Sequence, residues 1–389
     1  MKSRVIVVGG GAWGLPAALQ LQDRGFAVTL LERFEPGAPY ASNGGSSRLW
    51  RLADTQVWRS RAMLGTLGAM ERLSERLDEP VFRHTGLLWR DDISLPRTAE
   101  GLDSIGQRYE RIAAEDVGDC FPGLRPDGRD ALLVEQAGVV FPDRLLQGAL
   151  AAFLAAGGDY RPRTRVMSVS PGADWAEVTL EDGSTVSGDQ VLITAGPGTR
   201  ELLSGLELAV PLKPYIEQVV HLGDPDATPP APDLPALVDC PLGETPGIYA
   251  MPDLRRGYKV GLDVPLRALA GATLGDDLDR SEDSGRTEII RARIERDISS
   301  ITPRVLGVQV CTWTDSGDGD FVVGRTHPSV VLACGDSGEG FKYAAFMGEY
   351  LADLVEGGQG DEEFQQHWDP RRFGNRSTPR EAFDAVGRH

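Results

Sequence analysis

The start of the chain reads RVIVVGGGAWG from Arg4 to Gly14, and a second apolar run, AVTLL, begins at Ala27 and ends just before Glu32. This order predicts a strand, a glycine-rich turn, a helix and a second strand. The pattern Gly-x-Gly-x-x-Gly directly after a first strand is typical of a dinucleotide-binding unit. The expected fold class is therefore α/β (α+β), with a Rossmann-like domain.

The three glycines of the motif have separate predicted roles. Gly9 lets the chain turn tightly, Gly11 lets a pyrophosphate approach the backbone, and Gly14 lets the helix pack close to the strand. The free N–H groups at the helix start would hold the diphosphate. Glu32 can accept hydrogen bonds from both ribose hydroxyls and would repel a 2′-phosphate, which argues against NADP. The motif alone leaves NAD and FAD open, and a glycine-rich turn without a ligand is the alternative.

The composition is that of a globular protein with room for two domains. Of the 389 residues, 41% are hydrophobic and 25% are charged, and the formal net charge is −18. Such acidity argues against a nucleic-acid or anionic-membrane partner. Lysine occurs at only four positions, so each internal lysine is informative: Lys2, Lys213, Lys259 and Lys342.

The cysteines and the N-terminus bear on location. Cys120, Cys240, Cys311 and Cys334 are scattered without paired spacing, which fits a reducing cytoplasm and no metal site. The first strand begins by Arg4, and no apolar run approaches ~20 residues. We therefore expect a cytoplasmic protein without a signal peptide or a membrane segment.

The first half of the chain predicts a helical layer and the start of a second layer. Residues 33–47 read as a loop that wraps a ligand, and apolar spacing predicts a helix over 57–77. Residues 85–90 look like the first strand of a different layer, followed by a polar segment. Asp143 is the expected N-cap of a helix over 144–156.

The second half alternates between the two layers. A hairpin joins predicted strands 176–180 and 185–186, and a buried strand, 191–194, ends in a glycine-rich turn. Residues 210–263 read as strands and proline-rich loops, and 287–298 as a helix. The remaining predicted elements are strands 308–311, 321–324 and 330–334, a helix 343–355, and a polar tail after Asp369 that is draped or mobile.

This order predicts two interleaved domains. Three separated stretches would form the nucleotide-binding domain: 1–82, 143–206 and 305–370. Two intervals would form a mostly antiparallel-β substrate domain: 83–142 and 207–304. The C-terminal tail would be 371–389.

Six motifs in this chain occur in the order and spacing of a known family. They are Gly9-x-Gly11-x-x-Gly14 with Glu32, Ser47-Arg48-x-x-Arg51, Ile248-Tyr249-Ala250-Met251-Pro252, Gly257-Tyr258-Lys259-Val260-Gly261, Cys311-Thr312-Trp313 before Phe321, and Gly335-Asp336-Ser337-Gly338-x-Gly340-Phe341-Lys342. Together they resemble the D-amino-acid-oxidase superfamily of FAD enzymes. Within it, the chain looks like the branch of monomeric sarcosine oxidase, N-methyltryptophan oxidase, pipecolate oxidase, fructosyl-amino-acid oxidase and glycine oxidase.

The resemblance implies FAD as the cofactor and a role for each motif. Arg48 would lie at the flavin ring, and Arg51 and Lys342 would bind the substrate carboxylate. Lys259 would sit near flavin N5 and activate oxygen, and Cys311 would bond covalently to the flavin 8α-methyl group. The expected cofactor-binding residues are Gly9, Gly11, Ala12, Trp13, Gly14, Glu32, Arg33, Ser47, Arg48, Val166, Ala195, Gly196, Cys311, Gly335, Gly338, Gly340, Phe341 and Lys342.

Physical chemistry supports these roles and also offers alternatives. A carboxylate needs fixed cations, and Arg51 supplies a planar fork while Lys342 supplies a point charge. The alternatives are a surface salt bridge for Arg51, a chain reaching to solvent for Lys259 and a small buried hydrophobe for Cys311. Cys334 reads as a core residue, and the five histidines form no metal or triad arrangement.

Two pocket positions depart from the sarcosine-oxidase pattern. Asp263 stands where that pattern has a histidine, and Trp313 stands where it has a tyrosine. With Tyr249, both are expected to line the substrate pocket. Asp263 could bind a second cationic or hydroxyl group or be a solvated acid, and Trp313 could stack on a larger or flatter substrate. Sarcosine itself is therefore not the expected substrate.

The sequence thus predicts a monomeric FAD-dependent oxidase with a small-molecule substrate, an amino acid of the secondary, N-substituted-glycine or cyclic type. A hydride would pass to flavin N5, leaving an imine, and O2 would reoxidise the flavin to give H2O2. Alternatives are a dehydrogenase with another electron acceptor, a nicotinamide enzyme, a flavin monooxygenase and a flavin-bound subunit without catalysis. Lys259 argues against another acceptor, and the absence of a second dinucleotide motif argues against a monooxygenase.

Overall fold

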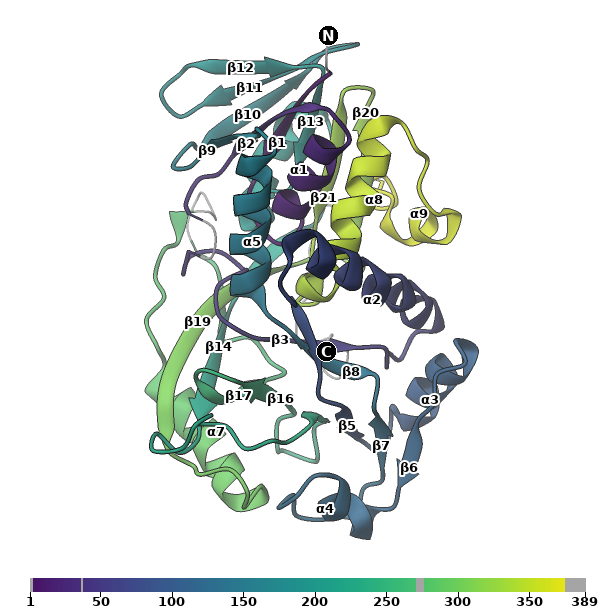
Figure 1. Ribbon diagram of the computed structural model, residues 1–389, viewed down its shortest axis with the longest axis vertical. Coiled ribbons are helices and arrows are strands. Elements are labelled where there is room, and N and C mark those ends of the chain that lie inside the picture. The colour runs from purple at the N-terminus through teal and green to yellow at the C-terminus, as the bar shows by residue number, and fades with distance from the viewer. Residues whose placement is uncertain (1–2, 36–37, 271–275, 375–389) are drawn as a thin grey trace.

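The computed structural model describes residues 3–35, 38–270 and 276–374. The predicted tail, 371–389, lies mostly outside the described residues. Two halves are visible in Figure 1, one built on a sheet covered by helices and the other on a larger sheet. Among the described helices, none combines the length and apolar content that crossing a bilayer requires.

The first half is built on a six-stranded sheet that is parallel except at β20. Because side chains alternate along a strand, Val5 and Val7 face one way and Ile6 and Val8 the other, and both pairs are buried. The sheet order is β20 (Val322–His327), β21 (Val330–Cys334), β13 (Gln190–Ile193), β1 (Arg4–Val8), β2 (Ala27–Leu31) and β9 (Asp159–Arg161).

Each face of this sheet has its own cover. The face of Val5 and Val7 shares a core with four helices: α1 (Gly14–Asp23), α2 (Val57–Leu77), α5 (Pro142–Ala155) and α8 (Ala344–Glu356). The face of Ile6 and Val8 shares a core with a small antiparallel sheet: β10 (Val166–Pro171), β11 (Ala176–Leu180) and β12 (Thr185–Gly188). After β13, the chain forms short turns of helix: η2 (Gly196–Gly198), α6 (Thr199–Leu202) and η3 (Leu203–Leu206).

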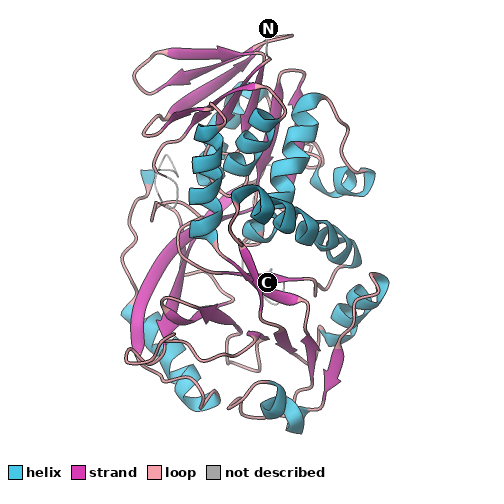
Figure 2. Ribbon diagram, in the orientation of Figure 1, coloured by secondary structure: helices cyan, strands magenta, loops and turns pink. Residues whose placement is uncertain are grey.

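The second half is built on a nine-stranded, mainly antiparallel sheet. Its strands are β18 (Arg267–Ala268), β14 (Lys213–Leu222), β17 (Gly257–Leu262), β16 (Ile248–Asp253), β15 (Ala236–Asp239), β5 (Leu87–Arg90), β7 (Ala131–Val134) and β6 (Glu110–Ile112), with β19 (Val305–Asp315) beside β14. Three of its helices, labelled in Figure 1, lie at the outer edge in Figure 2: α3 (Leu95–Ser104), α4 (Val117–Cys120) and α7 (Ser284–Asp297). The turn η1 (Ala114–Asp116) directly precedes α4.

A third sheet lies between the two halves and carries two predicted site residues. It consists of β3 (Arg48–Arg51), β8 (Ala137–Val140) and β4 (Phe82–His84). The long strands β14 and β19 run from the second half toward the first (Figure 1). The turn η5 (Gly340–Tyr343) leads into α8. These elements bring residues far apart in sequence to the junction of the halves.

The predicted elements are largely present, with several differences. Asp143 is not the N-cap of α5, because α5 begins at Pro142, two residues before the predicted start, and its N-cap is Phe141. Asp143 instead pairs with Arg255, and Pro142 takes the first helical position, where a missing N–H costs nothing. The elements from α3 to β7 and the helix α9 (Glu362–Trp368) were not predicted, although α3 has buried apolar residues at helical spacing, Leu95, Ala99 and Leu102. The domain boundaries themselves stay a prediction.

Candidate active site

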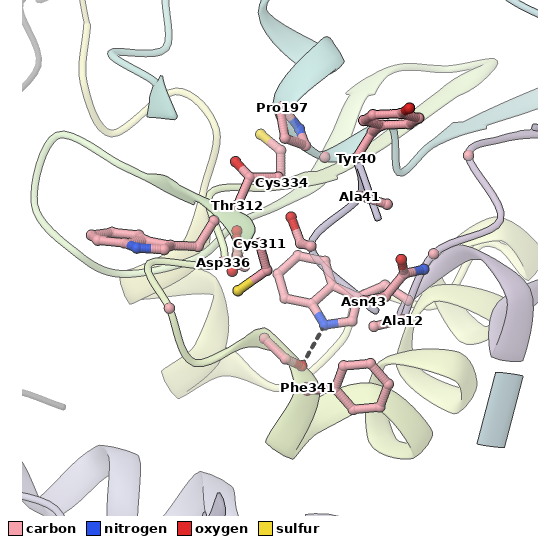
Figure 3. A pocket seen from close by; sticks show the side chains of 18 of the residues that line it. Ala12, Tyr40, Ala41, Asn43, Pro197, Cys311, Thr312, Cys334, Asp336 and Phe341 are labelled. Carbon is pink, nitrogen blue, oxygen red and sulfur yellow. Dashed lines mark hydrogen bonds between the residues drawn. The ribbon is translucent and has the colours of Figure 1, made fainter. Parts of the chain in front are cut away.

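One large cavity lies at the junction, with a volume of about 310 Å³. Figure 3 shows side chains from distant segments gathered around it, including Ala12, Asn43, Cys311 and Phe341. Every predicted site residue lines this cavity except Gly14 and Ser47, which lie behind its wall.

In the glycine-rich turn, two glycines are required for the strand and helix to pack, and one is not. A Cβ at Gly14 would lie 1.9 Å from the Gly9 carbonyl oxygen, and one at Gly9, whose φ is +103°, would lie 2.4 Å from the Thr194 carbonyl oxygen. Both positions must therefore be glycine for the strand and helix to pack. A Cβ at Gly11 would instead meet its nearest atom, Asn43 Nδ2, at 3.5 Å. The fold does not require Gly11, so the space above it is available to a ligand.

Glu32 and Trp13 fix the shape of this end of the cavity. The Glu32 carboxylate accepts hydrogen bonds from Gly10 N at 2.6 Å and Phe34 N at 2.7 Å. Burial raises the pKa of Glu32, and these hydrogen bonds oppose that rise. Trp13 Nε1 donates to the Gly340 carbonyl oxygen at 2.8 Å. This hydrogen bond connects the N-terminal glycine-rich turn to the turn η5.

The cavity fits FAD on the chemistry of its lining. Within the described residues, Ser42 Oγ, Asn43 Oδ1 and Gln309 Oε1 are buried without a hydrogen-bond partner. All three residues line the cavity, and buried polar atoms are normally paired, so a polar ligand would satisfy them. The open space at Gly11 and the acidic Glu32 complete a site suited to a dinucleotide.

At one end of the cavity two predicted cations converge on a carboxylate. Arg51 Nη2 and Lys342 Nζ both donate to Glu339 Oε1, at 2.9 Å and 2.7 Å. Arg59 Nη1 lies 3.5 Å from the other oxygen, Oε2. Arg51 is 2% exposed and also lies over the Trp89 ring, so it is not a surface residue. We call this the Glu339 cluster: Arg51, Arg59, Lys342, Asp54, Asp320 and Glu339.

The charges of the cluster hold one another in place. Burial lowers the pKa of Lys342 to about 8, with Arg51 adding to the effect and Glu339 opposing it. Burial acts to raise the pKa of Glu339, but Lys342, Arg51 and Arg59 outweigh it and hold that pKa well below its usual range. The Glu339 carboxylate therefore stays negatively charged.

Elsewhere in the cavity a second buried lysine has different neighbours. Lys259, on β17, donates from Nζ to the carbonyl oxygen of Ser47. Burial, aided by Arg48, lowers the pKa of Lys259 to about 7, while Asp253 opposes the shift. Ser47 does not line the cavity, and its hydroxyl donates to Asp253 at 2.9 Å. Lys259 is thus held inside and does not reach solvent.

The wall formed by β14, β16 and β19 carries the predicted pocket residues. Tyr249 lies across Gly261, where a Cβ would be 2.3 Å from its ring. Trp313 stacks on Tyr215 with 5.0 Å between ring centroids. Asp263 follows β17 and also lines the cavity. Cys311 lies there too, and burial raises the pKa of its thiol, which Arg48 opposes.

Several lining residues were not predicted. Glu217 pairs in register with Cys311, and burial raises its pKa to about 8 against the pull of Arg286. Asn43, Gln309 and Cys334 also line the cavity. Glu339 stands at an unassigned position inside the quoted glycine-rich turn, three residues before Lys342. That spacing was the one available signal, because it allows an ion pair within one helical turn.

Comparison with known proteins agrees with this geometry. The family model described as FAD dependent oxidoreductase matches residues 4–354. The chain is 25% identical to the monomeric sarcosine oxidase of Bacillus sp. (strain B-0618) over 364 residues, covering 90% of this chain and 91% of that protein.

Solved structures share the fold, and two of them illustrate the similarity. A variant of NikD, described as an unusual amino acid oxidase essential for nikkomycin biosynthesis, matches with a TM-score of 0.83 at 23% identity, over 95% of this chain and 97% of that one. L-proline dehydrogenase from P. horikoshii matches with a TM-score of 0.81 at 20% identity, over 97% and 99%. Because the family model spans most of the sequence, the chain belongs to the FAD-dependent oxidoreductases, and FAD is its cofactor.

Proposed function

We propose that the protein oxidises a secondary amino acid of the N-substituted-glycine or cyclic type, giving an imine, with O2 as the electron acceptor and H2O2 as a product. One observation carries the proposal. Arg51 and Lys342, far apart in sequence, donate to a single carboxylate oxygen on the cavity wall, at 2.9 Å and 2.7 Å. A pair of cations that holds one carboxylate in this way can hold that of a substrate. The curated relative named above, a sarcosine oxidase, supports the same class.

The residues divide the work between binding and oxygen reduction. Bound FAD supplies the hydride acceptor at N5 of its flavin ring. Arg51 and Lys342 would anchor the substrate and so fix which carbon faces that acceptor. Lys259, buried in the same cavity, would stabilise the negative charge that builds on O2 as it is reduced.

The wall residues favour a substrate larger than sarcosine. Trp313 offers a flat apolar surface and Asp263 an acidic group, and both line the cavity together with Tyr249. Glu217 also lines the cavity and pairs with Arg286. We infer a substrate whose amine carries a larger or ring-shaped body with a polar or cationic group.

We also propose a covalent link between Cys311 and FAD. Forming the C–S bond removes the thiol hydrogen and one hydrogen of the 8α-methyl group, together with two electrons that O2 accepts. Acid precipitation should leave the yellow colour in the pellet for the wild type and in the supernatant for Cys311→Ala. Cys334→Ala is the matched control, because Cys334 lines the same cavity, and it should keep the colour in the pellet. Colour in the supernatant for the wild type would make Cys311 a packing residue.

Three further points stand as proposals. We infer a monomer, with the FAD-binding domain formed by residues 1–82, 143–206 and 305–370 and the substrate domain by 83–142 and 207–304. The four cysteines are all free thiols, which supports a reducing compartment such as the cytoplasm. The test of the first point is the mass of the purified protein in solution.

The activity is tested with a panel of secondary amino acids and a peroxide assay. We expect peroxide in step with substrate loss, and a much smaller rate for Arg51→Met. Arg72→Met is the control, because this exposed arginine pairs with Glu349 on the surface, and it should behave as wild type. Turnover only with an artificial electron acceptor, with no peroxide, would favour the dehydrogenase alternative. Unchanged turnover in Arg51→Met would contradict the proposed site.

A further inference from the structure

Glu339 occupies the place where the substrate carboxylate is proposed to bind. Its Oε1 accepts from Arg51 and from Lys342, at 2.9 Å and 2.7 Å. All three side chains line the cavity as the described residues form it, whereas Asp54, Arg59 and Asp320 do not. A ligand in this part of the cavity would therefore contact two cations, Arg51 and Lys342, that already bind the same anion, Glu339.

The Glu339 cluster combines basic and acidic side chains, and burial raises the pKa of one acid, Asp54, against the opposing effect of Arg51. Its ionisable groups are three cations and three carboxylic acids: Arg51, Arg59, Lys342, Asp54, Asp320 and Glu339. Glu339 is 6% exposed and keeps its charge because its three cationic neighbours outweigh burial. An incoming carboxylate would therefore meet Glu339 as an anion and would have to share Arg51 and Lys342 with it.

A ligand that carries a cationic group as well as a carboxylate avoids this repulsion from Glu339. The ammonium group of an amino acid stands one carbon away from its carboxylate. Such a zwitterion brings no net charge into the cluster, and its nitrogen can take Glu339 as a partner while its carboxylate takes Arg51 and Lys342. A simple monocarboxylate has no group that compensates Glu339, and buried like charges repel strongly.

We propose that Glu339 is a specificity-determining residue, which makes this end of the cavity select a zwitterion, with the cationic nitrogen against Glu339, over a simple carboxylate. The inference rests on the proposed carboxylate site of Arg51 and Lys342. It deepens that function by assigning the ammonium end of the bound substrate to a side chain of this chain. The ammonium nitrogen must then lose one proton to the medium before the neighbouring carbon gives up its hydride.

Two ligands of the same shape test the proposal without turnover. Trimethylglycine and 3,3-dimethylbutanoate differ only in a charged nitrogen or a neutral carbon, and trimethylglycine has no free amine lone pair to support oxidation. Each is titrated into the FAD-loaded protein at constant ionic strength, and binding is followed by the change in flavin absorbance. We expect the wild type to bind trimethylglycine about tenfold or more tightly, the effect of one charged pair.

The variant Glu339→Gln keeps the shape of the side chain and removes its charge. We expect it to bind 3,3-dimethylbutanoate about tenfold more tightly than the wild type does, and to lose the preference for trimethylglycine. A preference retained in Glu339→Gln, or lost in Glu217→Gln instead, would overturn the proposal. A wild type that binds 3,3-dimethylbutanoate as tightly as trimethylglycine would overturn it as well, even if the variant does not fold.

Failure of the underlying function would look different. If Arg51→Met binds both ligands as the wild type does, the carboxylate site lies elsewhere and the inference falls with it. If Arg51→Met loses both ligands while the wild type shows no preference between them, the carboxylate site stands and only the role of Glu339 is wrong.

Discussion

Lys342 and Lys259 are both buried in the same cavity, yet their surroundings differ in one respect. Lys342 donates to the Glu339 carboxylate at 2.7 Å, whereas Lys259 donates to the neutral carbonyl oxygen of Ser47. Burial lowers both pKa values, to about 8 for Lys342 and about 7 for Lys259. Both lysines therefore change their charge close to neutral pH, but Lys342 has a carboxylate as its partner and Lys259 has a neutral oxygen.

The difference indicates two tasks. A lysine held by a carboxylate is placed to exchange that partner for another carboxylate, which suits substrate binding. A neutral oxygen does not neutralise the positive charge of a lysine, so such a lysine can stabilise negative charge that forms during a reaction. This property suits oxygen reduction. Replacing each lysine by methionine removes the charge and keeps most of the volume, so the pair can be compared directly.

The largest effect is expected at Lys259. Lys259→Met should slow the reaction of the reduced enzyme with O2 by about 10²- to 10³-fold, because the cation that stabilises reduced oxygen is lost. Reduction by substrate, measured separately without oxygen, should change only a few-fold. Stopped-flow absorbance of the two half-reactions makes the measurement. An unchanged oxygen reaction would end the assignment of Lys259.

Lys342→Met should show the reverse pattern. We expect kcat/KM for the amino acid to fall about 30-fold or more, mainly through KM, because one buried charge-assisted contact to the carboxylate is lost. The oxygen reaction of the reduced enzyme should stay near that of the wild type. Steady-state kinetics at saturating oxygen gives the first value. If both variants lose the same half-reaction, the two lysines do not have separate tasks.

A pair of glycine variants separates the cofactor site from the fold. Gly14→Ala should destabilise the protein by about 1–3 kcal/mol or more, because the added methyl would lie 1.9 Å from the Gly9 carbonyl oxygen. Gly11→Ala should leave the stability of the FAD-free protein near wild type, since its Cβ would be 3.5 Å from the nearest atom. Denaturant unfolding and FAD titration measure the two effects. Weaker FAD binding without loss of stability in Gly11→Ala would support a ligand role for that position, and unimpaired FAD binding would count against it.

The pH dependence of the oxygen reaction should follow Lys259. Its pKa is about 7, so the side chain is cationic below that pH and neutral above it. The rate with O2 should therefore fall as pH rises through about 7, by about tenfold at most for each pH unit above the pKa. Lys259→Met should show a flat profile in this range. A wild-type rate that rises with pH would contradict the assignment.

The sequence predicted the structure best where residues close together in the chain determine the local fold. The glycines at 9 and 14 have clear spacing, and the helix predicted over 57–77 is present as Val57–Leu77, because a long apolar stripe leaves little ambiguity. Arg51, Lys259 and Lys342 could be named because they lie in motifs that resemble a known family. In the structure all three line one cavity.

Ion pairs between residues far apart in the chain could not be predicted from the sequence. Glu339 was an unassigned position of a glycine-rich turn, and Glu217 was an acid in an apolar strand. Their importance depends on Arg51 and Arg286, which lie 288 and 69 residues away in the chain. Pairing across such separations is set by the packing of three sheets, so no local pattern reports it.

The central claim is that Arg51 and Lys342 hold the carboxylate of an amino acid that reduces the flavin. The most direct test mixes the FAD-loaded protein, without oxygen, with the best secondary amino acid of the panel or with its decarboxylated amine, and follows bleaching of the flavin. We predict fast bleaching by the acid, at least about 30-fold slower bleaching by the amine, and loss of this preference in Arg51→Met. Equal bleaching by acid and amine in the wild type would contradict the account.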